Sequence, residues 1–165
     1  ITNLVTLSRL DEEDPFPVRT EFSLSDVLWE ISEPFVSLAQ AKGKTYTQDI
    51  ADGLTVTGDR TAIQQMISIL LDNALKYSPD GGSISLTARR SGKKAEITVS
   101  NTTDGVRNID AARLFDRFYR ADESHSNTIS GTGIGLSIAK ATVDAHSGKI
   151  SAKQMGNTIT FQVTL

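Results

Sequence analysis

GTGIGLSIAK, residues 131–140, is the stretch that decides the fold, and it also gives the first indication of function. Alternate glycines let the backbone approach a ligand closely, and a helix directly behind them presents free N–H groups and a positive dipole end to an anion. The pattern indicates a phosphate-binding loop, although by itself it fits a structural tight turn equally well. Its late position, after a polar loop, argues against a doubly wound dinucleotide fold, which places such a turn after its first strand.

The composition is that of an ordinary globular domain. The 165 residues are 38% hydrophobic and 22% charged, which suits one domain with a full core. A net charge of −3 without a basic run argues against nucleic acid as a partner. The absence of cysteine rules out disulfides, thiolate metal sites and a cysteine nucleophile. With no apolar run of the roughly 20 residues that span a membrane, no signal-peptide pattern and no initiator methionine, the chain is expected to be a piece of a longer protein.

Hydrophobic periodicity, capping residues and turn residues predict the order of helices and strands. The clearest pattern covers residues 59–77, where apolar residues recur with helical spacing and form a core face of Ile63, Met66, Ile67, Leu70, Leu71 and Ala74. In chain order the expected elements are the end of a helix over 1–10, a helix capped by Ser23 that Pro34 should kink and that stops at Gly43, strands over 45–50 and 54–58 joined by a turn at 51–53, the helix over 59–77, strands over 83–90 and 95–100 joined by a turn at 91–94, a short helical segment around 110–115, a helix over 137–146, and strands over 149–154 and 158–165.

Helices placed between antiparallel hairpins predict the fold class. We expect an α+β domain, built as a two-layer α/β sandwich with a mixed, mostly antiparallel sheet and helices on one face.

A second stripe on the 59–77 helix flanks its core face and could contact a ligand. It consists of Ile69, Asn73, Lys76 and Tyr77. The neutral amide oxygen of Asn73 suits Mg²⁺, and Lys76 could meet a phosphate. The alternative is structural: Asn73 would bond a neighbouring loop and Lys76 would be solvated.

Three arginines and a polar loop lie between this helix and the glycines. Arg113, Arg117 and Arg120 alternate with apolar rings and could bind phosphate or form surface salt bridges. Residues 121–130 have the polar composition of a lid. His125 lies in this polar loop, and His146 lies near a helix end where an imidazole can cap carbonyls. Both histidines are therefore expected to have structural roles.

Three segments together resemble the N, F and G2 boxes of bacterial sensor histidine kinases: LLDNALKYS at 70–78, FDRFYR at 115–120 and GTGIGL at 131–136. The resemblance implies that residues 21–165 form a catalytic ATP-binding domain of the GHKL superfamily. It also implies that residues 1–14 end the dimerisation and phosphotransfer helix and that residues 15–20 are a linker.

The resemblance further implies the site. ATP and Mg²⁺ would be the cofactors, Asn73 would coordinate the metal, and Asn73, Arg117 and Arg120 would be catalytic. The implied nucleotide-binding residues are Asn73, Lys76, Tyr77, Asn101, Gly105, Arg117, Tyr119, Arg120, Gly131, Thr132, Gly133, Ile134, Gly135 and Leu136.

Two positions depart from the family pattern. The G1 box usually reads D-x-G-x-G, but Asn101, Thr103 and Gly105 stand at the corresponding positions. An asparagine oxygen can still accept a hydrogen bond from the adenine amino group, with binding weaker by about 1 kcal/mol. Ile69 stands where relatives often have Asn or an acid, which argues against the hydrolytic members that use a glutamate there.

The function implied is that of an ATP-binding kinase domain that phosphorylates a histidine and supplies a response regulator. The phosphoacceptor segment does not occur in these residues, so the chain is expected to bind ATP or ADP without phosphorylating itself. The parent protein would be a homodimer through upstream helices, with this domain in the cytoplasm and membrane attachment through other segments. The alternatives are a degenerate kinase that retains only protein interaction and an anti-sigma serine kinase.

Overall fold

A five-stranded sheet forms one layer of the molecule in this computed structural model, which describes residues 15–104, 113–116 and 134–165. The edge strand β2 runs parallel to β4, and the other neighbours are antiparallel. The prediction of a mixed, mostly antiparallel sheet is therefore confirmed. In spatial order the strands are β2 (Thr45–Ile50), β4 (Ser83–Ser91), β5 (Lys94–Thr102), β7 (Thr158–Thr164) and β6 (Lys149–Met155).

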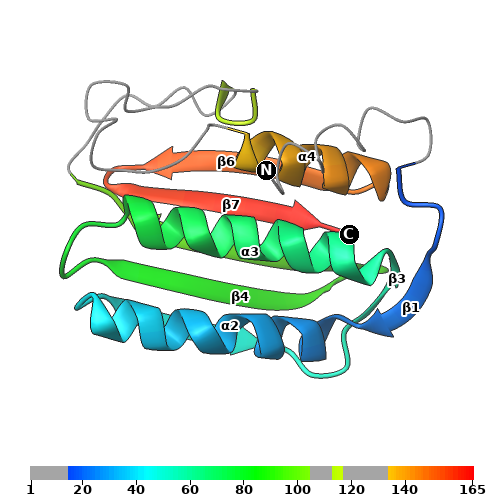
Figure 1. Cartoon of the computed structure of the whole chain (residues 1–165), viewed down its shortest axis with the longest axis horizontal. Coiled ribbons are helices and arrows are strands. Elements are labelled where there is room, and N and C mark those ends of the chain that lie inside the picture. Colours follow the sequence, from blue (N-terminus) through cyan, green and yellow to red (C-terminus); the bar gives the residue numbers. More distant parts are fainter. Residues whose placement is uncertain (1–14, 105–112, 117–133) are drawn as a thin grey trace.

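Three helices form the second layer and cover one face of this sheet: α2 (Leu24–Ala41), α3 (Arg60–Tyr77) and α4 (Gly135–Ala145) (Figure 1). All six predicted core residues of α3 are buried. On the central strand β5, the residues that face the helices are buried and alternate with half-exposed polar ones. This alternation is what one covered face requires, and it confirms the two-layer sandwich.

The predicted helix caps are present. The Ser23 hydroxyl accepts the Asp26 N–H at 3.1 Å, and the Asp59 carboxylate accepts the Ala62 N–H at 2.9 Å. Gly43 follows the end of α2 with a φ of 69°, as a helix-ending glycine should. Pro34 lies within α2, which continues on both sides, and its kink stays a prediction.

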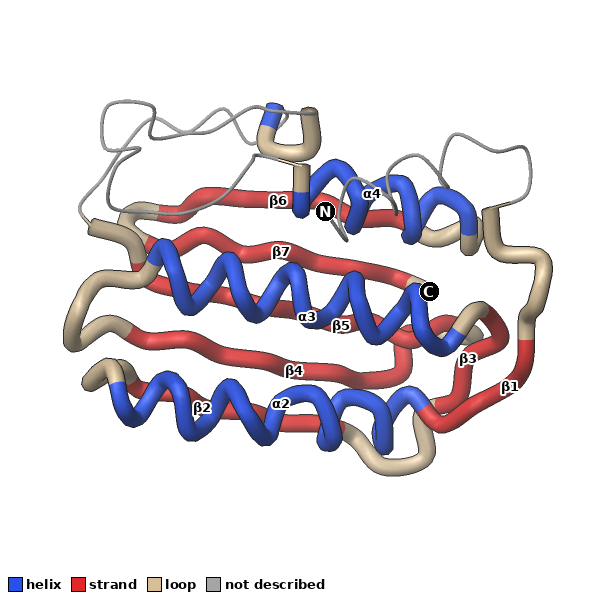
Figure 2. Tube along the Cα trace, viewed as in Figure 1, coloured by secondary structure: helices blue, strands red, loops and turns tan. Residues whose placement is uncertain are grey.

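The strands predicted at 45–50 and 54–58 exist, but they do not pair with each other. Strand β3 (Thr55–Gly58) instead pairs with β1 (Thr20–Ser23), which the sequence did not predict, in a separate two-stranded sheet (Figure 2). The start of α2 explains the difference. The Ser25 hydroxyl donates to the Ala51 carbonyl at 2.7 Å and accepts the Leu54 N–H at 3.0 Å, so it takes backbone groups that a hairpin would use.

Other boundaries of helices and strands differ from the predicted ones by one or two residues. The turn between β4 and β5 contains only Gly92 and Lys93, rather than residues 91–94, and Gly92 has a φ of 64°. Helix α4 begins at Gly135, two residues before the predicted start. None of the helices that the structure describes is long and apolar enough to cross a membrane.

Several predictions lie outside the described residues. These are the helix end at 1–10, the lid at 121–130, His125, Gly105, Arg117, Tyr119, Arg120, Gly131, Thr132 and Gly133. Of the short helical segment around 110–115, only the part from Arg113 is described.

Helix α4 ends in a Schellman motif with a serine in the left-handed position. Ser147 has a φ of 58°, its N–H donates to the Asp144 carbonyl, and the Gly148 N–H donates to the Val143 carbonyl. This conformation is unfavourable for a residue that carries a Cβ.

We therefore expect Ser147→Gly to raise the free energy of unfolding by about 1 kcal/mol, because glycine adopts this conformation without strain. Urea unfolding of the chain measures the change. Ser147→Ala is the matched control, since it removes the hydroxyl but keeps the Cβ. Equal stability of the glycine and alanine variants would contradict the prediction.

Candidate nucleotide-binding site

Three elements meet at one end of the sandwich. Helix α3 and strand β5 end there, and helix α4 begins there (Figures 1 and 2). Ile69 of α3 packs against Ile134 and Ile138 at the start of α4, and a Cβ added to Gly135 would lie 3.4 Å from Ile69 Cγ2. The turn of α3 that precedes Asn73 is therefore in direct contact with the N-terminus of α4. Ile69 acts here as a packing residue.

Asn73, Lys76 and Tyr77 lie on the last turns of α3 and are half-buried. Lys76 Nζ lies 2.9 Å from Asp72 Oδ2, in an ion pair within the helix. Partly exposed pairs of this kind contribute less than about 1 kcal/mol, so a phosphate could replace the carboxylate. The lysine is thus available to an anionic ligand.

Asn101 continues the apolar row of β5 that faces the helices. Ala95, Ile97 and Val99 precede it on the same face, and Asn101 itself is only 4% exposed. Its Nδ2 donates to the Thr102 carbonyl at 2.9 Å. A polar side chain in a buried row requires partners, and the Asn101 amide supplies Oδ1 as an acceptor at the end of the sheet where α4 starts.

The first turn of α4 carries N–H groups that its own N-cap residue cannot satisfy. That residue is Ile134, whose side chain is 1% exposed and makes no capping hydrogen bond. An uncapped helix N-terminus favours an anion through its free N–H groups and its dipole. Ile134 and the half-buried Leu136 pack into the core, so their part in binding would be through the backbone.

The described part of the arginine-containing segment is anchored to the sheet. The rings of Phe115 and Phe161 are edge to face, with centroids 6.0 Å apart. Arg113 pairs with Asp116 at 3.6 Å, and both side chains are exposed. Arg113 therefore has the surface ion pair that was the structural alternative for it.

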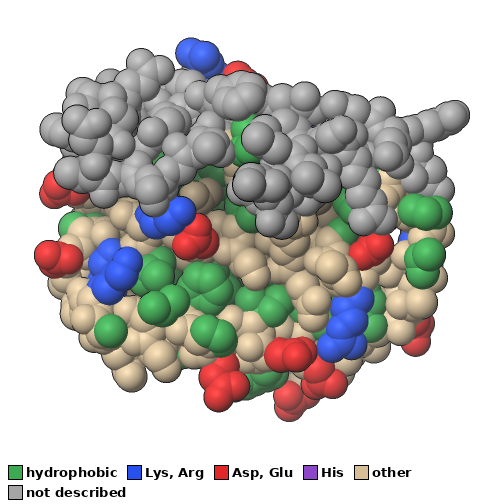
Figure 3. All heavy atoms as spheres, in the orientation of Figure 1, with side chains coloured by type: hydrophobic (Ala, Val, Ile, Leu, Met, Phe, Trp, Pro, Cys, Tyr) green, Lys and Arg blue, Asp and Glu red, His purple; other side chains and the backbone are tan. Residues whose placement is uncertain are grey.

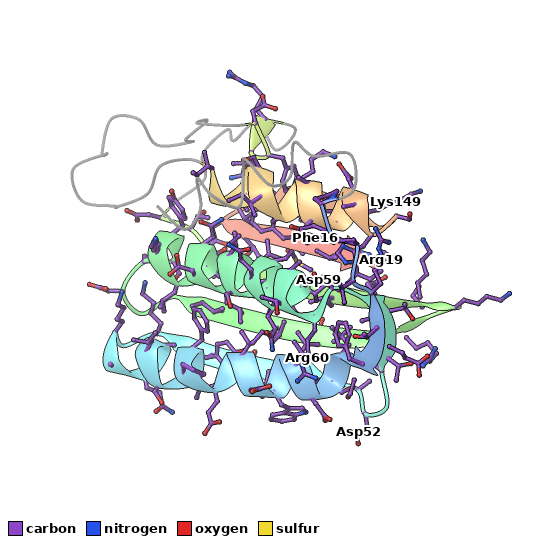
Figure 4. The ribbon with its side chains drawn as sticks, turned by 45° about the vertical axis from the view of Figure 1, so that its right-hand side comes forward. Phe16, Arg19, Asp52, Asp59, Arg60 and Lys149 are labelled. Atoms are coloured by element: carbon purple, nitrogen blue, oxygen red, sulfur yellow. The ribbon has the colours of Figure 1, made fainter. Side chains whose placement is uncertain are left out.

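The opposite ends of α3 and α4 are joined through His146. Its Nε2 accepts the Asp59 N–H at 3.0 Å, and its Nδ1 lies 2.7 Å from the Thr142 carbonyl, so the ring is neutral with the proton on Nδ1. Phe16, only 3% exposed, stacks at a tilt on this ring, and Arg19 donates to the Ala145 carbonyl at 2.8 Å (Figure 4). The predicted structural role of His146 is confirmed.

Lys44 was not predicted as part of the site. Its Nζ donates to the Leu75 carbonyl at 2.5 Å and to the Ser78 carbonyl at 2.7 Å, at the C-terminus of α3. Burial lowers the pKa of this ammonium, Lys42 lowers the pKa further, and Asp80 opposes them. No local signal could have identified it, because a lysine after a helix-ending glycine looks like an ordinary turn residue.

On the helical face, charges of both signs are interspersed around apolar side chains over α2 and α3 (Figure 3). The described part of this face therefore has no basic patch of the kind that binds nucleic acid. Among the described residues, no group of three or more His, Cys, Asp or Glu side chains could hold a metal.

A model of the family described as "Histidine kinase-, DNA gyrase B-, and HSP90-like ATPase" matches residues 58–165. Over its whole length the chain is 38% identical to the probable sensor protein PcoS of Escherichia coli, of which it covers 37%. It is 33% identical to the sensor-like histidine kinase SenX3 of Mycobacterium tuberculosis, of which it covers 40%. The chain thus spans less than half the length of these relatives.

Solved structures have the same fold. The nucleotide-free catalytic domain of the histidine kinase ThkA is similar with a TM-score of 0.78 and 25% identity, covering 90% of this chain and 95% of that one. Full-length ShkA in complex with AMPPNP gives a TM-score of 0.83 at 22% identity over 99% of this chain and 34% of that one, which supports the fold alone. The chain therefore belongs to the histidine kinase-, DNA gyrase B- and HSP90-like ATPase family.

Proposed function

We propose that this domain binds ATP and Mg²⁺ and transfers the γ-phosphate to a histidine of a phosphotransfer domain. The observation that carries the proposal is that the end of α3, which bears Asn73, the end of β5, which bears Asn101, and the start of α4 lie at one end of the sandwich (Figures 1 and 2). Among the described residues, the N-cap Ile134 gives this start of α4 no side-chain capping hydrogen bond. These groups differ in chemistry, and each suits a different part of one ligand. An amide acceptor suits an adenine amino group, free N–H groups suit phosphates, and an amide oxygen suits a hard cation.

Asn73 suits a magnesium site in which the protein supplies few of the ligands. Mg²⁺ prefers oxygen ligands in octahedral geometry and commonly retains waters and phosphate oxygens, so one amide oxygen from the protein is sufficient. When bound, the cation supplies neutralisation of the phosphate charge. The residues proposed to contact the phosphates directly are Lys76, Arg117, Arg120, Gly131, Gly133 and Gly135, and those proposed to complete the pocket are Tyr77, Gly105, Tyr119, Thr132, Ile134 and Leu136.

The transfer step requires positioning more than covalent participation by this domain. The bond between the γ-phosphorus and the bridging oxygen breaks, a bond between that phosphorus and an imidazole nitrogen forms, and ADP leaves. Ile69, which packs against Ile134 and Ile138 of the α4 start, has no group that could activate a water, which favours transfer over hydrolysis.

The wider assignment extends to the parent protein. We propose that residues 1–14 end a phosphotransfer helix and residues 15–20 are a linker, and that the parent is a homodimeric, membrane-attached sensor kinase with this domain in the cytoplasm. A response regulator would receive the phosphoryl group. The relatives named as sensor proteins support the sensor-kinase part of this assignment.

Calorimetry with ADP and ATP, with and without Mg²⁺, tests the proposal on the chain itself. We expect micromolar dissociation constants that depend on Mg²⁺. We also expect the chain to phosphorylate a supplied phosphotransfer domain only when that domain retains its acceptor histidine. No nucleotide binding would favour the degenerate signalling module. Binding without transfer to any supplied phosphotransfer domain would contradict the kinase assignment.

Asn101→Ala is expected to weaken ADP binding about tenfold, because it removes one hydrogen bond to the base in a buried position. Affinity for inorganic pyrophosphate, which has no base, should not change. Ser100→Ala is the matched control, since Ser100 is the neighbouring residue on the opposite face of β5, where its hydroxyl contacts the Thr160 hydroxyl at 2.9 Å. Equal loss of ADP and pyrophosphate affinity in Asn101→Ala would contradict adenine recognition by this residue.

A further inference from the structure

Lys44 holds the end of the helix that carries Asn73. Its side chain crosses from the start of β2 to the C-terminus of α3, where Nζ contacts the carbonyl oxygens of Leu75 and Ser78. The residue is only 9% exposed. A buried ammonium requires hydrogen-bond acceptors, and these two carbonyls supply them.

The helix end needs such a donor. The last carbonyls of a helix lack partners within the helix, and they form its negative dipole end. Here the Ser78 N–H satisfies the Ala74 carbonyl at 3.1 Å, while the Ser78 hydroxyl reaches the Leu75 carbonyl at 3.3 Å. Lys76, the basic residue of the last turn, is paired with Asp72 instead. Lys44 thus brings a full positive charge to this helix end from another element.

The backbone around Lys44 is itself fixed on both sides. The Lys44 N–H donates to the Ala39 carbonyl of α2 at 2.9 Å, and the Thr45 N–H donates to the Gly82 carbonyl, before β4, at 2.9 Å. The ammonium therefore extends from a point tied to α2 and to the start of β4. Because the backbone of Lys44 is anchored in this way, its side chain can fix the position of a helix end relative to the sheet.

The two carbonyls bracket the residues proposed to bind nucleotide. Leu75 and Ser78 lie on either side of Lys76 and Tyr77, and Asn73 lies within the preceding turn. We propose that Lys44 is a positioning residue, which sets the last turns of α3 so that Asn73, Lys76 and Tyr77 meet the nucleotide. This inference rests on the proposed function, because it assigns Lys44 to that same site.

Lys44→Met leaves the Leu75 and Ser78 carbonyls without this donor, so it is expected to lower the unfolding midpoint. A purely stabilising role predicts that the folded variant still binds Mg²⁺–ADP with unchanged affinity. The positioning role predicts that the folded variant also binds Mg²⁺–ADP about tenfold more weakly, as loss of a supporting contact typically does at a metal site. Lys44→Arg, which retains charge and donors, should recover most of the affinity.

Lys42→Met is the matched control, because it removes the same charge from an exposed lysine two residues away. Its ADP affinity should equal that of the unaltered chain. Hydrogen exchange of the Tyr77 and Ser78 amides, measured without nucleotide, should accelerate at least several-fold in Lys44→Met and not in Lys42→Met. Lys44→Gln, which keeps a neutral donor, replaces Lys44→Met in each comparison if the latter does not fold.

The outcomes separate this inference from the proposed function. Unchanged ADP affinity in Lys44→Met, or an equal loss in Lys42→Met, would overturn the positioning role. A loss of affinity that Lys44→Arg does not recover, together with unchanged amide exchange, would also overturn it. If the unaltered chain itself does not bind ADP, the proposed function fails, and the exchange rates alone decide whether Lys44 holds the end of α3.

Discussion

Asn73→Ala is expected to remove the Mg²⁺ dependence of ATP binding and to lower the affinity for Mg²⁺–ATP about 100-fold. The alanine retains the helix but lacks the amide oxygen that would coordinate the cation, and the remaining ligands would come from phosphate and water. Interactions of charged groups with a well-placed polar partner contribute about 1.5–3 kcal/mol, which corresponds to a 10- to 100-fold change in affinity. Titration calorimetry with ATP, in Mg²⁺ and in a chelator, measures both values.

Two variants make this result specific. Asn73→Asp keeps an oxygen ligand of the same size, so its binding should still depend on Mg²⁺, whereas Asn73→Ala should bind ATP equally with and without the cation. Thr61→Ala alters an exposed residue in the first turn of the same helix, far from the site, and should bind as the unaltered chain does. Mg²⁺-dependent binding that persists in Asn73→Ala would rule out Asn73 as the ligand.

Much of the fold could be predicted because local chemistry and tertiary packing agree. The apolar stripe of α3 required a helix that buries Ile63 to Ala74, and Asp59 and Ser23 cap the helices that they precede. Asn73 could be singled out because it lies on a second stripe of α3 beside the core face, and Asn101 because it stands where the G1 box of the resembling family has its aspartate.

The rest depends on contacts between segments distant in the sequence. The Ser25 hydroxyl bonds the Ala51 carbonyl and the Leu54 N–H, which a hairpin between β2 and β3 would use, and β3 pairs with β1 instead. The sequence around residues 51–53 favours a turn, but it does not specify with which strand the segment after the turn pairs. Lys44 reaches carbonyls more than 30 residues away, and its role follows only from the packing of α2, α3 and β2.

Gly58→Ala is expected to lower the free energy of unfolding by about 2–4 kcal/mol. A Cβ at Gly58 would lie 2.5 Å from His146 Cδ2, 2.8 Å from His146 Nε2 and 3.1 Å from Ile63 Cδ1. The imidazole cannot simply turn away, because Nδ1 is bonded to the Thr142 carbonyl and Phe16 stacks on the ring. Overpacking of this kind costs about 1–3 kcal/mol, and displacing the ring also breaks its bond to the Asp59 N–H. Urea unfolding monitored by circular dichroism gives the value.

The cause can be isolated, because the clash involves one side chain. Gly135→Ala adds the same methyl group where the nearest atom lies at an ordinary 3.4 Å, so it should not destabilise the chain. If His146 is first replaced by alanine, the space beside Gly58 opens, and Gly58→Ala in that background should cost less than about 1 kcal/mol. The difference between the two backgrounds is a coupling energy of about 2 kcal/mol, which is typical of residues in direct contact. An equal cost in both backgrounds would mean that α3 and α4 are not joined through His146 in the way that the hydrogen bond to Asp59 indicates.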